Sequence, residues 1–372
     1  MITIGPAHRR AAPADARAAW QRRRGPRRRG PHPQGRRAQL ATGLLAIGLA
    51  ATACSSGSGS TGSSSATAGT TSLSGVTLHV GDQAGTGAEA VLTAAGLIRK
   101  LPFKVAWSDF TSGPPMLQAM SGGAVDIGGV GDAPPVFAAA GGDKIAIVGA
   151  RTANPLGSAI VVPQGSPIRS VAQLKGKKIA VAQGSSANYH ILALLKKGGL
   201  TVRDVTLQYL QPAQALAAFA PGHVDAWDVW SPYIEEAVAT DHGRILATGA
   251  GLGTVYSFEV ASRAALADPA KAAAIKDYLK LLNEAYLWTN AHQQAWATDW
   301  AKATGLSDGI MLQAAMDSVT TPVPVTPAVV SSEQSISDAF TAAGLIPVRV
   351  NFANYSVATF NSAVTSSRGT SS

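Results

Sequence analysis

From Gly75 onward, short runs of β-branched and aromatic residues alternate with helical segments, and this alternation constrains the possible fold most. The predicted strands are 76–80, 103–110, 125–130, 144–150, 158–162, 178–182, 205–210, 224–230 and 244–248. The first predicted helix covers 88–100, and glycines follow most strand ends. Such alternation predicts α/β architecture with mainly parallel sheets. After about Ala264 we expect helices only: one long segment ending at Gly305, then two helices over 307–319 and 327–343.

The N-terminal segment has a different character. Residues 1–37 contain eleven arginines and one acid, and residues 40–53 are apolar and uncharged. Because about 20 apolar residues are needed to span a bilayer, the stretch 40–53 is too short for a transmembrane helix. Its length and flanks are typical of the apolar region of a signal peptide. We therefore predict that residues 1–53 are a signal peptide with a long basic n-region. The pair Arg36-Arg37 leaves Sec or twin-arginine export open.

Cys54 is the only cysteine, so the chain can form neither an internal disulfide nor a cysteine metal site. The segment 51–54, Ala-Thr-Ala-Cys, resembles a bacterial lipobox, in which the cysteine is acylated. Residues 55–74 are rich in Ser, Gly and Thr, a composition typical of a flexible tether. The sequence thus predicts export, lipidation at Cys54 and anchoring to the outer face of the cell membrane.

Charge and motifs exclude several classes of function. The net charge is +9, but after residue 37 the chain carries 20 basic and 21 acidic residues. This balance argues against a nucleic-acid partner, because phosphate binding requires clustered positive charge. No G-x(4)-G-K-[ST] or G-x-G-x-x-G motif follows the strands, so a nucleotide cofactor has no support. H-E-x-x-H and G-x-S-x-G are also absent. We therefore predict no metal, no cofactor, no catalytic residues and no enzyme.

Four segments of the sequence are distinctive enough to indicate a protein family. They are Ser112-Gly113-Pro114, VDIGGVGDAPPVFAAAGG (125–142), GSPIRSVAQLKGKKIAVAQGSS (165–186) and HVDAWDVWSPY (223–233). In this order they resemble the solute-binding proteins of ATP-binding-cassette (ABC) importers in the nitrate/sulfonate/taurine family, closest to the aliphatic-sulfonate-binding branch. The resemblance implies a type II periplasmic-binding-protein fold, with two α/β lobes joined by a two-segment hinge. Lobe 1 would be 75–157 plus 259–372 and lobe 2 would be 158–258, with crossings near 156–159 and 253–258.

The same resemblance implies a monomer that captures a small organic anion in the cleft, releases it unaltered, and docks on ABC permease membrane subunits. Turns at the carboxyl ends of the strands would face that cleft. Backbone N–H groups and hydroxyls at helix starts can satisfy the three oxygens of a sulfonate. The candidate ligand-binding residues are Gln83, Ser112, Gly113, Asp132, Ala133, Ser185, Ser186, Asn188, Asp228 and Trp230. Gln83 matches a residue near the ligand in sulfonate-binding proteins, and Asn188 stands where the family commonly has His. Asp132 would either cap its helix or recognise a ligand amine.

Several alternatives stay open on sequence grounds. Ser112, Ser185 and Ser186 are equally compatible with simple N-cap roles. Trp227 is expected in the core. Arg151 is the one cation that could lie near the cleft, although a surface salt bridge is the favoured role. The ligand could be an alkanesulfonate, taurine, nitrate, a small aromatic acid or a pyrimidine. The alternative function is a thiamine-precursor or pyrimidine-binding protein, or a related biosynthetic enzyme.

Overall fold

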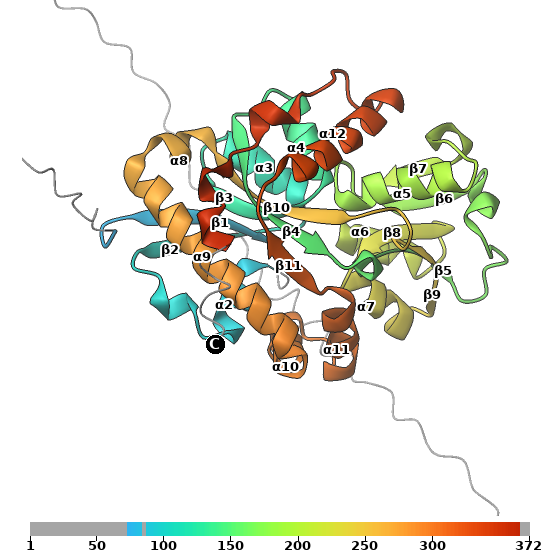
Figure 1. Cartoon of the computed structure of the whole chain (residues 1–372). Coiled ribbons are helices and arrows are strands. Elements are labelled where there is room, and N and C mark those ends of the chain that lie inside the picture. The colour runs from blue at the N-terminus through green and yellow to red at the C-terminus, as the bar shows by residue number, and fades with distance from the viewer. Residues whose placement is uncertain (1–72, 84–86, 365–372) are drawn as a thin grey trace, which may run out of the picture. The chain divides into compact units, whose positions relative to one another are not determined.

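The computed structural model describes residues 73–83 and 87–364, and these residues build two β-sheets flanked by helices (Figure 1). The first sheet has six strands in the order β11-β4-β10-β3-β1-β2. Their bounds are β1 Thr77–Gln83, β2 Lys104–Phe110, β3 Ile127–Gly131, β4 Ile145–Ala153, β10 Val255–Ser262 and β11 Thr320–Val323. The predicted signal peptide, Cys54 and nearly all of the predicted tether lie outside the described residues.

The second sheet has five strands in the order β7-β6-β8-β5-β9. Their bounds are β5 Ser158–Pro163, β6 Lys178–Val181, β7 Thr206–Tyr209, β8 Ala226–Trp230 and β9 Gly243–Thr248. The chain leaves the first sheet between β4 and β5 and returns to it between β9 and β10. Each sheet with its helices forms one lobe, so the fold is the expected two-lobed α/β architecture. The lobe boundaries at 157/158 and 258/259 stay a prediction.

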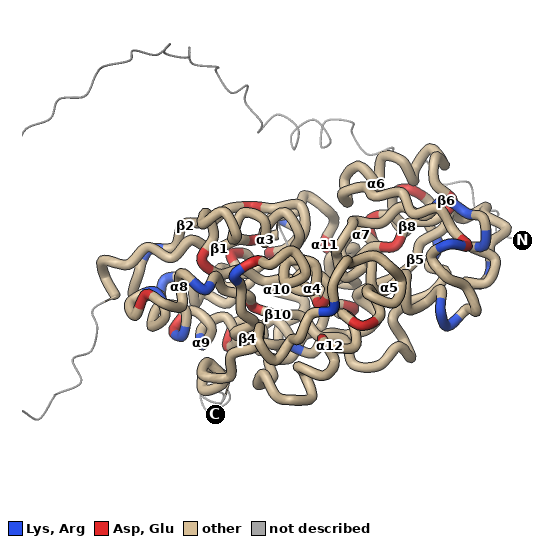
Figure 2. Tube along the Cα trace, turned by 90° about the horizontal axis from the view of Figure 1, so that it is seen from above, with Lys and Arg blue, Asp and Glu red and all other residues tan. Residues whose placement is uncertain are grey.

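Helices cover the sheets of both lobes. Those of the first lobe are α2 Ala88–Ala94, α3 Gly113–Ser121, α4 Ala133–Ala140, α8 Arg263–Ala267, α9 Pro269–Ala291, α10 Gln293–Thr304, α11 Asp308–Asp317 and α12 Pro327–Ala342. Those of the second are α5 Ser186–Lys197, α6 Pro212–Phe219 and α7 Tyr233–Thr240. Among the described residues, no helix has both the length and the apolar character that crossing a membrane requires. Charged residues of both signs are spread over both lobes (Figure 2).

The sheets are mixed, and the expectation of mainly parallel sheets was wrong. Strands β1, β2 and β3 are parallel, as are β6, β7 and β8, but β10 is antiparallel to both β3 and β4. The reason is the return crossing: β10 enters the first sheet from the side where β3 ends. Strand β11 pairs antiparallel with β4, and β5 pairs antiparallel with β8 and β9.

Two strands were missed, and two helical segments were predicted too long. β10 was expected to be a connecting segment, and β11 lies where only helices were expected. β11 is short and sits at the sheet edge, where a proline is tolerated, so its sequence carries little strand signal. The helix expected over 88–100 ends at Ala94, just before Gly96 turns the backbone left-handed at φ +68°. The long segment divides at His292 into α9 and α10, which ends at Gly305 as predicted.

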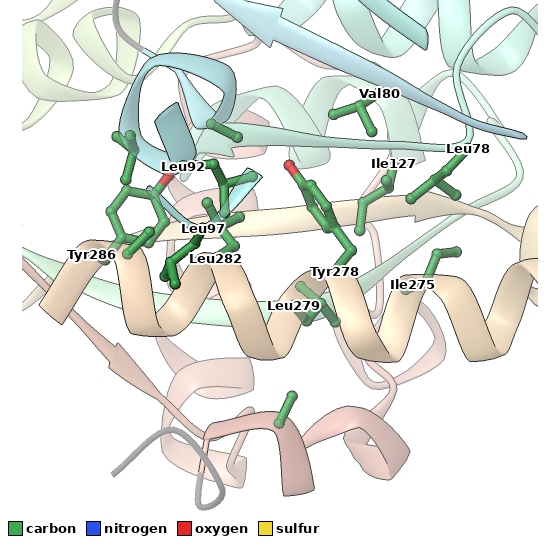
Figure 3. Close-up of a cluster of buried hydrophobic side chains, with 14 of the residues drawn as sticks. Leu78, Val80, Leu92, Leu97, Ile127, Ile275, Tyr278, Leu279, Leu282 and Tyr286 are labelled. Atoms are coloured by element: carbon green, nitrogen blue, oxygen red, sulfur yellow. The ribbon is translucent and has the colours of Figure 1, made fainter. Parts of the chain in front are cut away.

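The core of the first lobe lies on both faces of its sheet. On one face Leu78 and Ile127 pack with Ile275 and Leu282 of α9 (Figure 3). On the other face α3, α4 and α12 cover a second buried cluster. Fully burying one such aliphatic side chain contributes about 1.5–3 kcal/mol. This packing fixes the strands whose ends form the site described next.

Candidate ligand-binding site

A cavity of about 240 Å³ lies between the two lobes. The first lobe lines it with the ends of β1, β3 and β4 and the starts of β10 and β11. The second lobe contributes the start of α5 and the end of β8. The cavity therefore occupies the place where open α/β sheets bind ligands, outside the carboxyl ends of strands. Its volume is just below the range of about 300–1,000 Å³ typical of drug-sized ligands, so it suits a small molecule.

Half of the predicted site residues line this cavity: Gln83, Gly113, Ser185, Ser186 and Trp230. Gln83 ends β1, and its Nε2 donates to the carbonyl of Gly129 at 3.1 Å. Trp230 is half-buried at the end of β8. The structure thus gathers residues separated by nearly 150 positions in sequence around one small volume.

The other predicted residues are buried beside the cavity without lining it: Ser112, Asp132, Ala133, Asn188 and Asp228. The Ser112 hydroxyl donates across the lobes to Oε1 of Gln211 at 2.8 Å. Asp228 is fully buried and lies 2.9 Å from Nδ1 of His190. Trp227 is buried in the core, as expected. Direct ligand contact by these residues stays a prediction.

The turn before α5 is held by Asn188 rather than by a serine cap. Neither Ser112 nor Ser185 caps its helix with a side-chain hydrogen bond, although each occupies the N-cap position. Ser185 Oγ instead donates to the carbonyl of Ala182 at 2.7 Å. Oδ1 of Asn188 accepts from the N–H of Gly184, whose φ of +70° favours glycine. Asn188 therefore shapes the turn that presents α5 to the cavity.

The starts of α3, α4 and α5 meet at one end of the cavity. A Cβ on Gly113 would lie 2.6 Å from Pro134, and a Cβ on Gly131 would lie 1.9 Å from Oγ of Ser186. Only glycine allows these close approaches. In both α3 and α4 the second and third residues are prolines, which have no N–H to donate. The first turn of α5, at Ser186, is therefore the main source of backbone donors here. The expectation was that the starts of several helices would donate N–H groups to the anion.

The start of α2 is occupied by the chain's own carboxylate. Asp82 accepts from the N–H of Ala88 at 2.8 Å and of Glu89 at 3.0 Å. Burial raises the pKa of Asp82 to about 6, although these backbone hydrogen bonds oppose the rise. A Cβ on Gly87 would lie 1.4 Å from Asp82 Oδ1. Because the carboxylate fills the helix start, α2 offers a ligand no free donor there.

Arg151 lies in the cavity wall and is buried, contrary to the expected surface salt bridge. Its guanidinium donates to Glu259 and lies 4.3 Å from the centroid of the Tyr286 ring. Burial acts to lower the pKa of Arg151, but Tyr286 and Glu259 raise it overall. The salt bridge exists, then, but it is a buried one that presents a cation beside an aromatic ring.

Two further acids lie behind the site, at the contact between the lobes. Asp132 precedes α4 and its carboxylate is hydrogen-bonded by the side chain of Ser186. Burial raises the pKa of Asp132 to about 6. Glu333 of α12 is also buried, and burial together with the Asp132 charge raises its pKa well above the usual range. Neither oxygen of Glu333 has a hydrogen-bond partner among the described residues. The interlobe contact therefore contains a buried carboxyl group whose surroundings disfavour its charged form.

Sequence reasoning missed several residues that line the cavity: Asp82, Tyr256, Tyr286, Trp300 and Thr320. Tyr286 and Trp300 lie within predicted helices, where aromatic residues at helical spacing indicate a core face. No local pattern shows that α9 and α10 return to the first lobe beside Arg151.

The structure shows no metal centre in its described part, where no three or more His, Cys, Asp or Glu side chains are grouped to hold an ion. His190 and Asp228 form a buried pair, and neither residue lines the cavity. Burial acts to lower the pKa of His190, but the Asp228 charge raises it overall. Burial raises the pKa of Asp228. His190 and Asp228 thus form a buried hydrogen-bonded pair.

Two α/β lobes with a small cavity at their junction define a protein of the type II periplasmic-binding fold. The chain belongs to the NMT1-like family, whose family model matches residues 75–305. A relative from Escherichia coli (strain K12), described as an aliphatic sulfonates-binding protein, is 36% identical over 250 residues. The match covers 67% of this chain and 77% of that relative.

Solved structures agree with this assignment. The alkanesulfonate-binding protein SsuA from Xanthomonas axonopodis pv. citri, bound to MOPS, is similar with a TM-score of 0.73 and 33% identity. The similarity covers 76% of this chain and 99% of that one. The desulfurization enzyme DSZB is more distant, with a TM-score of 0.56, 17% identity and coverage of 79% of this chain and 99% of that one. That likeness shows the fold alone.

Proposed function

We propose that this protein is the substrate-binding component of an ABC importer, which captures an organic sulfonate in the interlobe cavity and delivers it unaltered to a membrane permease. The observation that carries the proposal is the polar end of the cavity, where Gly113 approaches Pro134 and Gly131 approaches Ser186. The start of α5 offers backbone donors to an anion there, and Arg151 adds a cation elsewhere in the wall. The names of the relatives, which are sulfonate-binding proteins, support the same substrate class.

The proposal places the protein outside the cytoplasm. Acylation of Cys54 would anchor the chain to the membrane, and the predicted tether would keep the lobes near the permease. The protein would act as a monomer, and the proposal assigns it no catalytic step.

A thermal-shift panel tests the proposal. The panel contains alkanesulfonates, taurine, nitrate and pyrimidine precursors of thiamine. A ligand present at 100 times its dissociation constant should stabilise the protein by roughly 2.7 kcal/mol. We expect this stabilisation with sulfonates. Stabilisation by the pyrimidines alone would overturn the proposal in favour of the thiamine-precursor alternative, and conversion of the bound sulfonate into a product would show an enzyme instead.

A further inference from the structure

The cavity has two chemically different ends. Ser257 of β10 pairs with Gly131 of β3 on one side and with Arg151 of β4 on the other. Because neighbouring strands lie about 4.8 Å apart, Gly131 and Arg151 are separated by roughly 10 Å. The donor-bearing start of α5 is at the Gly131 end, since Ser186 touches Gly131. A sulfonate bound there leaves space for the rest of the ligand to extend toward Arg151.

The cavity has aromatic walls. Trp230, Tyr256, Tyr286 and Trp300 line the cavity and come from β8, β10, α9 and α10. Figure 3 shows Tyr286 extending from α9 toward Leu92. Aromatic side chains on several sides fit a planar ring better than a thin chain, because stacked and edge-on rings gain more than buried area alone provides.

Each of these rings is backed by another group, so the walls are held in place. Trp300 stacks on Trp296 with ring centroids 5.0 Å apart, and Tyr256 stacks near Phe258 at 6.4 Å. Trp230 meets the edge of Tyr233 at 6.2 Å. The guanidinium of Arg151 covers Tyr286. Walls fixed in this way lose little side-chain entropy on binding, which favours a rigid ligand.

Two of the lining residues, Trp300 and Arg151, carry hydrogen-bond donors. Trp300 is 3% exposed, and its Nε1 has no hydrogen-bond partner among the described residues. Arg151 adds a cation. The one acid among the described lining residues is Asp82, whose two oxygens already accept backbone N–H groups. A ligand ammonium would therefore meet a cation and an indole N–H without a free carboxylate.

We propose that the preferred ligand is an arylsulfonate that places its ring between Trp230, Tyr286 and Trp300 and a hydrogen-bond acceptor near Nε1 of Trp300. Short aminoalkyl sulfonates such as taurine would bind weakly. This inference rests on the proposed function, because it specifies the sulfonate that the same cavity takes.

Isothermal titration calorimetry with matched ligands tests the inference. Benzenesulfonate, cyclohexanesulfonate and hexanesulfonate have the same number of carbon atoms but differ in shape and aromaticity, and ethanesulfonate and taurine are the short ligands. We expect benzenesulfonate to bind at least tenfold more tightly than hexanesulfonate, and taurine to bind most weakly. Equal or tighter binding of hexanesulfonate or taurine would overturn the inference while leaving the proposed function in place. If no sulfonate binds, the proposed function itself is wrong.

A pair of variants tests the role of Trp300. Trp300→Phe keeps a ring and removes the N–H, so the affinity for 4-hydroxybenzenesulfonate should fall about tenfold while that for benzenesulfonate changes by less than threefold. Trp296→Phe, which changes the ring beneath Trp300 outside the cavity lining, is the control and should leave the ratio of the two affinities unchanged. If the ratio of the two affinities is the same in wild type and Trp300→Phe, the indole N–H does not bind the ligand. Because this readout is a ratio within one protein, partial misfolding does not mimic it.

Discussion

Replacing Asp132 by Asn should change how stability depends on pH. Burial raises the pKa of Asp132 from 3.8 to about 6. Between these values the folded protein binds more protons than the unfolded chain, so the free energy of unfolding falls as pH rises. A shift of about two pKa units corresponds to roughly 3 kcal/mol, of which about 2 kcal/mol develops between pH 4.5 and 7.5. Asn cannot ionise, so the variant should not incur this loss.

The assay is urea unfolding of wild type and Asp132→Asn at both pH values. We expect the stability of the variant relative to wild type to increase by about 2 kcal/mol from pH 4.5 to pH 7.5. Hydrogen bonds lost to the amide cancel in this difference, because they are absent at both pH values. Asp308→Asn changes an exposed carboxylate at the start of α11 and should show no comparable difference. A pH-independent effect of Asp132→Asn would refute a raised pKa at Asp132.

Two further substitutions test the contacts that shape the site. Gly131→Ala places a Cβ 1.9 Å from Oγ of Ser186, so sulfonate affinity measured by calorimetry should fall at least tenfold; unchanged affinity would show that this close approach is dispensable. Gly165→Ala meets no atom within 4 Å and is the control. Asp228→Ala leaves His190 buried without its carboxylate, so urea unfolding should show a loss of about 3–5 kcal/mol. A loss below about 1 kcal/mol would mean that the pair contributes little to stability.

The sequence was sufficient to predict α/β architecture, because strand and helix periodicities are local signals, whereas the two lobes followed from the resemblance to the solute-binding family. It placed the cavity correctly at the strand ends through residues such as Gly113, Ser185 and Trp230, which the structure brings together. Local signals could not show strand direction: β10 runs antiparallel because of a crossing that depends on the whole chain. The edge strand β11 has four residues and includes a proline, so it resembles a loop.

The remaining site residues depend on contacts between distant segments. The spacing of Tyr286 and Trp300 indicates the buried face of a helix. They line the cavity because α9 and α10 pack on the first lobe. The sequence was compatible with Ser185 as an N-cap. Its hydroxyl instead donates to the carbonyl of Ala182, and Asn188 accepts from the N–H of Gly184 in the same turn. The sequence could not show that Arg151 is buried, because its partner Glu259 lies 108 residues away in sequence. Such pairings require the three-dimensional arrangement.

A crystal structure of the complex with benzenesulfonate tests the central claim most directly. The account predicts sulfonate oxygens within hydrogen-bond distance of the N–H of Ser186, with the ring pointing toward Arg151. A sulfonate bound outside the interlobe cavity, or a complex in which Ser186 makes no contact with it, would contradict the account.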